Sequence, residues 1–245
     1  MRTISCTGWP EFKRDFFLEL FGDGHFRRER YLFRGAGDAD WRLATAFDRR
    51  FAAVPLPERL KLWDSLLAQW RAGCLEAGVA REVVDDDRAL AALGQHHGLP
   101  TRLLDWSLSP YVAAFFAFRS HLLRGPDTIG SQVAVWALHL DNPVWRGGDG
   151  GVEVVTAPGG GNTRLQNQGG RFTLCRAATS SLEEYVERVA EGVALTRCLL
   201  PAACAAEALA DLDAMGVTDH QLFPDLDGLA DMATMRAALA ARPGP

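Results

Sequence analysis

The residues best suited to chemistry lie close together in the segment 94–110. This segment holds two histidines, one arginine, one aspartate and three hydroxyl groups in otherwise apolar surroundings. From Thr101 the residue types alternate, so Thr101, Asp105 and Ser107 share one face of a predicted short strand. A helix with Ser109 as its N-cap is predicted to follow directly. Polar groups where a strand ends and a helix begins can bind an anion or a nucleotide.

A purely structural interpretation of the same residues stays open. Arg102 or Arg34 could pair with Asp105, because polar groups inside proteins are nearly always hydrogen-bonded. Arg34 ends a short apolar strand predicted at residues 31–34 and is followed by Gly35. An arginine in that place needs an anionic partner or must point into a cleft.

A glycine-rich segment at residues 147–170 is a further candidate. It contains nine glycines but lacks the spacing of a P-loop or a dinucleotide-binding turn. We therefore interpret it as a mobile active-site or surface loop. Its second half brings Arg164, Gln166 and Gln168 to the start of the next predicted strand.

No metal site is expected. The adjacent aspartates Asp85, Asp86 and Asp87 are interpreted as the start of a helix, where negative charge suits the helix dipole. His96 and His97 are neighbours on that helix and do not share a face. The five cysteines are odd in number and lack zinc-site spacing, which indicates reduced, mostly buried thiols.

Composition limits the class of protein. The 48% apolar content and 23% charged content are those of a globular chain, and the net charge is −5. No strong binding to duplex DNA is expected, although a local basic groove from the run 27–34 stays open. No signal peptide or membrane span is recognised, so we expect a cytoplasmic protein with no membrane partner, while export by a specialised secretion machine stays open.

The predicted elements indicate an α+β fold with a bent or split mixed β-sheet, surrounding helices and a cleft between its halves. The strands are expected near residues 31–34, 101–107, 132–140, 152–156, 171–175 and 194–200. The helices are expected near residues 10–21, 57–79, 88–97, 111–123, 180–191 and 201–215, followed by a last helix. We expect one domain over residues 1–245, with a core at about 31–230 on which the N-terminal helix and the C-terminal helices pack.

Several of these segments together resemble the FRG domain family, which is named for a Phe-Arg-Gly motif. The matching residues are Phe33-Arg34-Gly35, Trp41-Arg42-Leu43, the run from Gln95 to Ser107 with Ser109-Pro110, the segment with Arg164, Gln168, Gly169 and Phe172, and Phe223-Pro224-Asp225-Leu226-Asp227-Gly228. The family name implies no settled activity.

A more distant similarity is to arginine-type ADP-ribosyltransferases, whose core this fold is expected to resemble. Phe33-Arg34-Gly35 is similar to their Arg-Gly strand, and Trp106-Ser107-Leu108-Ser109 to their aromatic-Ser-x-Ser element. Gln166-Asn167-Gln168 stands where they carry a Gln/Glu-x-Glu motif. The last glutamate is replaced by Gln168, and an amide cannot act as a general base near neutral pH. Asp105 or Glu153 could supply the carboxylate, and Asp105 is preferred.

This resemblance implies an enzyme that uses NAD as a substrate, of the kind found among toxins and phage-defence effectors. Arg34 would grip the diphosphate, since a guanidinium binds phosphate with two parallel hydrogen bonds. The candidate catalytic residues are Arg34, Asp105 and Gln168. The candidate ligand-binding residues are Arg34, Gly35, Gln95, His97, Thr101, Arg102, Ser107 and Arg164.

Two other functions stay open. The chain could be a non-catalytic module that senses a nucleotide or a nucleic acid, or it could be a hydrolase or nuclease that uses His97 with Asp105. In each case the expected ligand is a nucleotide-type molecule, and the macromolecular acceptor or target is unknown.

Overall fold

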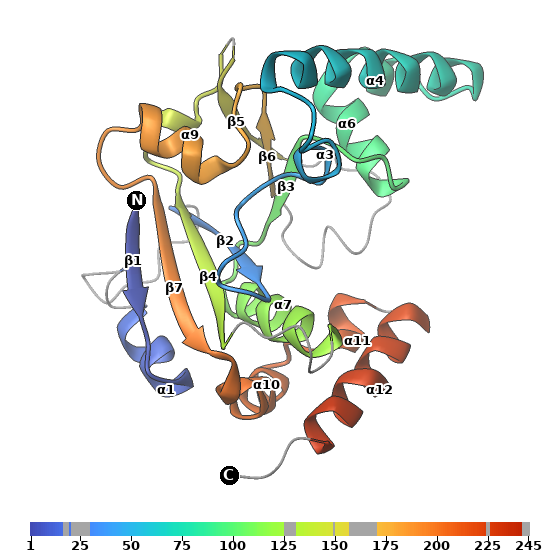
Figure 1. The fold of residues 1–245 in the computed structure, drawn as a ribbon. Coiled ribbons are helices and arrows are strands. Elements are labelled where there is room, and N and C mark those ends of the chain that lie inside the picture. The colour runs from blue at the N-terminus through green and yellow to red at the C-terminus, as the bar shows by residue number, and fades with distance from the viewer. Residues whose placement is uncertain are drawn as a thin grey trace.

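Two β-sheets and the helices packed on them form the fold (Figure 1). The computed structural model describes residues 1–16, 20, 30–124, 131–148, 150–156, 171–223 and 226–241. The strands are β1 (Arg2–Ser5), β2 (Tyr31–Ala36), β3 (Leu103–Trp106), β4 (Gln132–His139), β5 (Val152–Thr156), β6 (Arg171–Cys175) and β7 (Leu195–Pro201). The main helices are α1 (Trp9–Glu11), α3 (Ala46–Arg50), α4 (Leu56–Glu76), α5 (Arg81–Val84), α6 (Asp87–His96), α7 (Pro110–Leu123), α9 (Leu182–Val189), α10 (Ala205–Ala214), α11 (Asp219–Leu222) and α12 (Leu226–Ala240).

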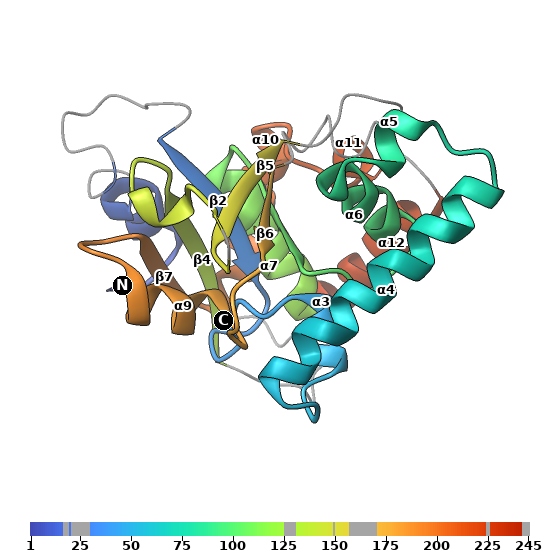
Figure 2. The same ribbon diagram turned by 90° about the horizontal axis from the view of Figure 1, so that it is seen from above.

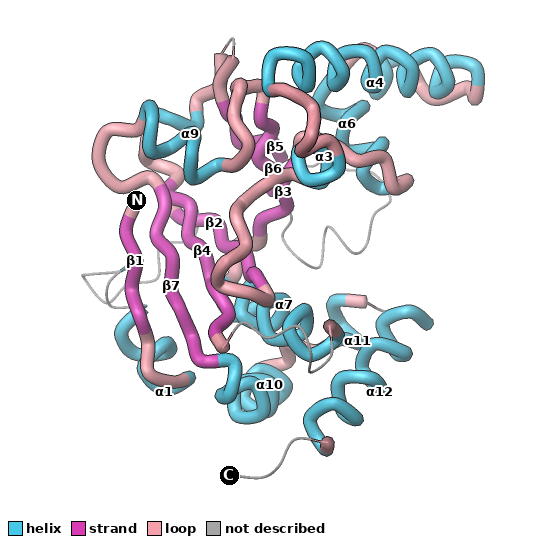
Figure 3. Tube along the Cα trace, viewed as in Figure 1, coloured by secondary structure: helices cyan, strands magenta, loops and turns pink. Residues whose placement is uncertain are grey.

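The larger sheet is mixed and has the strand order β1-β7-β4-β2. Its β1–β7 pair is parallel and its other pairs are antiparallel. The smaller sheet has the order β3-β6-β5 and is antiparallel. The two sheets stand apart in the trace of Figure 3. The prediction of an α+β fold with a split mixed sheet is therefore confirmed at the level of its architecture.

A short backbone bridge joins the two sheets. The amide of Phe33 in β2 donates to the carbonyl of Ser107 just after β3, and the amide of Ser107 donates back to Phe33, each over 2.7 Å. Ser107 also begins the turn into α7, because its Oγ accepts the amide of Ser109 at 3.0 Å. The junction of both sheets and the start of α7 thus lie at one point.

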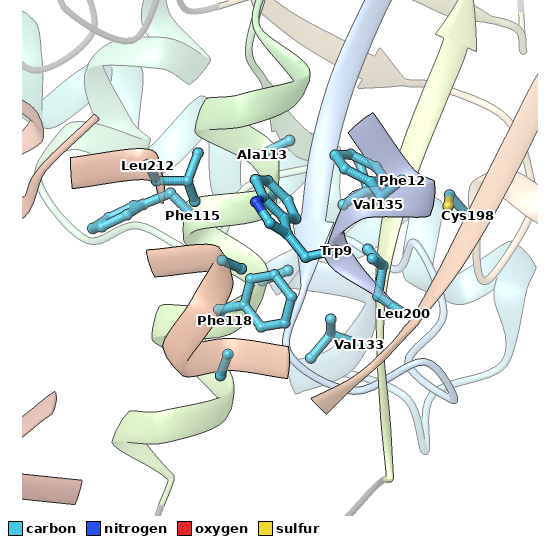
Figure 4. Packing of buried hydrophobic residues seen from close by; sticks show 14 of the residues in the cluster. Trp9, Phe12, Ala113, Phe115, Phe118, Val133, Val135, Cys198, Leu200 and Leu212 are labelled. Atoms are coloured by element: carbon cyan, nitrogen blue, oxygen red, sulfur yellow. The ribbon is translucent and has the colours of Figure 1, made fainter. Parts of the chain in front are cut away.

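The central strand β4 is covered on both faces, which explains its continuous apolar sequence. Val133, Val135 and Ala137 face α7, α10 and the N-terminal helical segment, where Trp9 and Phe12 fill the core (Figure 4). Residues of the opposite register, such as Trp136, face α9 and the inner face of the smaller sheet. The hydrophobic effect therefore joins both sheets in one core.

The outer face of the smaller sheet is covered by α3, α4 and α6. Phe172 and Leu174 of β6 pack in one cluster with Trp63 of α4 and Leu90 of α6. Figure 2 shows the length of α4 beside α5 and α6. This cluster fixes the end of α6, and therefore Gln95, relative to β3.

The predicted element bounds agree with the structure to within a few residues, with some exceptions. The strand β1 was not predicted, and neither were the short helices α3 and α5. The N-terminal helix begins at Trp9, and part of the predicted range 10–21 lies outside the described residues. Asp86 is the N-cap of α6, as expected, since its carboxylate accepts the amide of Arg88 at 2.9 Å.

The five cysteines all belong to the described residues and are free; four are buried and Cys204 is partly buried. The prediction that the cysteines are mostly buried is confirmed. None of the helices described here is both long and apolar enough to cross a membrane.

Candidate functional site

A pocket of about 720 Å³ opens where β2, the end of β3 and α7 meet. Its volume is within the usual range for small-molecule sites. Its wall includes Arg34 and Gly35 of β2, Asp105, Ser107, the segment 40–44, and one face of α7. The sequence prediction that polar groups gather where β3 ends and α7 begins thus corresponds to a real cavity.

Asp105 is held in place by a chain of hydrogen bonds. Its Oδ1 accepts the Gln95 Nε2 amide at 2.7 Å, and the Gln95 Oε1 accepts the Thr101 hydroxyl at 2.5 Å. Because Thr101 is fully buried, the orientation of the Gln95 amide is fixed. The Asp105 side chain is still 54% exposed, so the carboxylate is positioned yet reachable from solvent.

Arg34 reaches Asp105 from the neighbouring sheet. Its Nη1 donates to the Asp105 backbone carbonyl at 2.8 Å and lies 3.7 Å from the Asp105 Oδ2. Burial lowers the pKa of Arg34, Asp105 acts to raise it, and the nearby Arg49 guanidinium lowers it further. An arginine stays charged in any case. Three arginines (Arg34, Arg42 and Arg49) and two aspartates (Asp40 and Asp105) line the pocket, so positive charge is in excess at its wall and suits an anion.

The three residues of the Phe-Arg-Gly motif have separate roles. Phe33 is buried in the core and its backbone joins the two sheets. The Arg34 side chain lies on the opposite face of β2 from Phe33, as alternation along a strand requires, and lines the pocket. Gly35 lets α7 approach β2, because a Cβ at this position would lie 1.9 Å from the carbonyl oxygen of Ala113. Gly35 lines the pocket, but its absent side chain serves strand–helix packing.

Arg102, predicted to bind a ligand, lies in the core instead. It is 1% exposed, its Nη2 is 3.3 Å from Asp48 Oδ1, and it donates to the carbonyl of Ala177 at 3.0 Å. The prediction that its guanidinium faces the ligand is therefore wrong. The structural alternative holds in a changed form, because the partner is Asp48 and not Asp105.

Other predicted residues are placed differently. Ser107 lines the pocket. Thr101 does not line it, but its hydroxyl donates a hydrogen bond to Gln95, which in turn holds Asp105. His97 ends α6 as an exposed residue beside Trp70, with ring centroids 6.3 Å apart, and it does not line the pocket. Arg164, Gln166 and Gln168 lie outside the described residues.

Glu153, the other candidate carboxylate, belongs to a different cluster. Burial acts to raise its pKa, but hydrogen bonds from Arg88 and Arg176 outweigh this effect and leave the pKa lowered. The residues around it form a second hollow that includes Asp86 and Arg146. Glu153 is thus an ion-pair partner of two arginines, and of the two candidate carboxylates it is Asp105 that lines the main pocket.

Sequence reasoning missed several pocket residues. Arg49 approaches Arg34, and the Arg42 side chain has no hydrogen-bond or ion-pair partner within the described part of the chain. Phe116 and Phe223 supply an aromatic wall. Arg42 and Phe223 stood in segments that resembled the FRG family, but no local pattern indicated that they face a common cavity.

No group of three or more His, Cys, Asp or Glu side chains suited to a metal ion was found in the residues that the structure covers. The acidic run at Asp85 to Asp87 instead flanks the second hollow and the start of α6.

Comparison with known proteins finds one similarity. Residues 29–124 match the family model of the FRG domain. The match covers the pocket residues Arg34, Gly35, Asp105 and Ser107, and also Gln95, which holds Asp105. No curated protein and no solved structure matches the chain.

Proposed function

We propose that the pocket binds NAD and that the chain transfers ADP-ribose from it. The observation that carries this proposal is the pairing of Arg34 with Asp105 across the sheet junction, at the wall of a nucleotide-sized pocket. A partly compensated guanidinium suits a diphosphate, and an exposed, positioned carboxylate suits the developing positive charge on a ribose.

The diphosphate would be bound by Arg34 together with Arg49 and Arg42. All three side chains line the pocket, and two are close enough for their charges to interact. Guanidinium groups bind phosphate oxygens with paired hydrogen bonds, so a diphosphate would replace the missing countercharge.

Asp105 would act at the ribose that carries nicotinamide. The bond between C1′ and the nicotinamide nitrogen breaks, and its electron pair leaves with neutral nicotinamide. The nucleophile of the acceptor forms the new bond to C1′, and its proton passes to the Asp105 carboxylate. Gln95 and Arg34 contact that carboxylate, and Ser107, which lines the same pocket, would hold a ribose hydroxyl.

Support for an ADP-ribosyltransferase-like core comes from chain order and from the split sheets. The Arg-Gly strand and the Trp-Ser-x-Ser element meet at the pocket, and they follow one another in the chain order that the proposed resemblance requires. Gln168 remains a proposed contact to the ribose. A role as a toxin or phage-defence effector in the cytoplasm belongs to this proposal, with the acceptor left open.

The second candidate is a nucleotide-sensing module without turnover. It is favoured by the replacement of the motif glutamate by Gln168, and by the Gln95 hydrogen bond and the Arg34 ion pair that already engage the Asp105 carboxylate. The hydrolase alternative receives less support, because His97 lies away from the pocket that Asp105 faces.

The test is release of nicotinamide from NAD by the purified chain, measured by chromatography, together with calorimetric binding of NAD. We expect Asp105→Asn to lower nicotinamide release at least 100-fold while NAD still binds, because the amide keeps the shape but loses the charge. Arg34→Lys should weaken NAD binding about tenfold, because the paired hydrogen bonds are lost.

Asp213→Asn, an exposed change on α10 away from the pocket, is the matched control and should leave both measurements unchanged. Binding of NAD without any release of nicotinamide would select the sensing module. Absence of NAD binding at millimolar concentration would remove the proposal.

A further inference from the structure

The pocket wall includes residues along β2 and along α7, so its two ends can be distinguished by their lining. Gly35 packs against Ala113, and Gly37, just beyond β2, packs against Ser120, so strand and helix run side by side in the same direction. The bridge to Ser107 lies at the Phe33 end. A helix rises about 1.5 Å per residue, which places Phe116 about 9 Å along the axis from the start of α7.

Phe223 lies at the far part of this wall and comes from outside the matched family segment. Its ring meets the Phe116 ring edge to face, with centroids 5.7 Å apart and an interplanar angle of 88°. The guanidinium of Arg119 lies 4.3 Å from the centroid of the Phe223 ring. Arg119 is itself held by Asp219, at 2.8 Å, and by Asp231.

The C-terminal helices fix the position of Phe223. Gly228 in α12 lies so close that a Cβ there would be 2.3 Å from the carbonyl oxygen of Phe223 and 2.5 Å from its Cβ. Only glycine allows this approach without displacing the phenylalanine. Met235, buried at 5% exposure, anchors the same helix in the core. An aromatic side chain supported in this way loses little entropy when a ligand ring packs on it.

We propose that Phe223, with Phe116, binds the adenine ring of the nucleotide. The inference rests on the proposed function for the class of ligand. It adds the part of the pocket in which the adenine ring of that ligand binds. Asp105 and Ser107 lie at the end of the pocket where the reacting ribose would bind. The arginines that would bind the diphosphate, Arg34, Arg42 and Arg49, line another part of the wall. The aromatic wall further along α7 is therefore left for the distal base. Heteroaromatic bases pack favourably on aromatic side chains, and the Ser120 hydroxyl lines the same pocket.

A consequence is that specificity for the base resides partly outside the FRG domain match. The matched segment ends at residue 124, and Phe223 follows almost one hundred residues later. The C-terminal helices thus complete a binding site whose polar half belongs to the matched family segment.

The test compares AMP with nicotinamide mononucleotide, which share the ribose phosphate and differ in the base. Calorimetric affinities are measured for NAD and for both mononucleotides with the wild type and with Phe223→Leu, which keeps apolar volume but removes the flat ring. We expect Phe223→Leu to weaken AMP and NAD about tenfold and to leave nicotinamide mononucleotide unchanged. Phe223→Tyr should retain wild-type affinity for AMP.

Met235→Ala is the matched control, because it loosens the packing of α12 without removing a pocket residue. It should lower the melting temperature and change AMP affinity much less than Phe223→Leu does. Equal AMP affinity in Phe223→Leu and wild type, equal loss of both mononucleotides, or a wild type that binds nicotinamide mononucleotide but not AMP would each overturn the inference. Phe223-dependent binding of AMP without any turnover of NAD would uphold it and count against the transferase.

Discussion

Asp48 in α3 is a buried anion that two buried guanidinium groups share. Its Oδ1 lies 3.3 Å from Arg102 Nη2 and 3.5 Å from Arg59 Nη1. Thr45 donates to its Oδ2 at 2.6 Å. All four side chains are buried, so the ion pairs are shielded from water and each charge depends on the others.

We predict that Asp48→Asn destabilises the protein by about 3–5 kcal/mol, because it leaves buried positive charge without a counterion. Urea denaturation followed by circular dichroism measures the change. Asp64→Asn, an exposed change on α4, should stay within about 0.5 kcal/mol of the wild type. A loss as small for Asp48→Asn as for this control would show that the cluster does not need its carboxylate.

This cluster also explains why the prediction that Arg102 binds a ligand was wrong. The sequence offered Asp105 as a possible partner of Arg102, although alternation along the predicted strand already put the two side chains on opposite faces. The actual partner lies 54 positions away in the chain, where no pattern of periodicity can reveal it. The Arg34–Asp105 contact, 71 positions apart, was predictable as one of several pairings only because both residues were chemically unusual for their places.

At the scale of elements, the contact between β2 and α7 sets the floor of the pocket. Gly35 and Ala113 are the small residues that allow it, and Ser109 caps the helix by accepting the amide of Val112 at 3.3 Å. Strand and helix therefore approach to backbone distance beside Arg34. The position of this arginine depends on two small side chains nearby.

Gly35→Ala is expected to destabilise the protein by about 3 kcal/mol or more, because the added methyl group overlaps the Ala113 carbonyl oxygen. Gly73→Ala in α4 is the matched control, since a Cβ there meets no atom within 4 Å. That change should stabilise the helix by about 0.5–1 kcal/mol. Chemical denaturation of both variants checks the opposite signs, and a neutral Gly35→Ala would contradict the packing argument.

Elements were predictable where their sequence is strongly patterned. The continuous apolar run of β4, the N-cap and proline of α7, and the capping serine of α9 each identified an element close to its observed bounds. The edge strand β1 was missed because it is short and mostly exposed, and its pairing with β7 joins opposite ends of the chain. The sheet order depends on such distant pairings, which alternation within one strand cannot specify.

At the scale of the whole molecule, stability should depend on pH through His139 in β4. Burial, followed by the charges of Arg2 and Arg30, lowers the pKa of His139 to about 4. Its Nε2 lies 2.8 Å from the Thr196 hydroxyl of β7. The folded protein therefore holds this histidine neutral at pH values where the unfolded chain would already protonate it.

We predict that the free energy of unfolding falls as the pH is lowered from about 6.5 to about 4. In that range the unfolded state binds more protons, so stability rises with pH and falls with acidification. The contribution of His139 should be about 2 kcal/mol, allowing for its partial exposure. Urea denaturation across this range should show a flatter profile for His139→Gln, and an unchanged profile would contradict the assignment.

The reciprocal hydrogen bonds between Phe33 and Ser107 have a mechanical consequence. They fasten one sheet to the other beside the groups that would grip a ligand. A ligand bound by both Arg34 and Asp105 would add a second link between the two sheets at the same junction. The binding free energy of that ligand would be lost if either sheet unfolded. Ligand binding should therefore make the two sheets unfold together, as one cooperative unit.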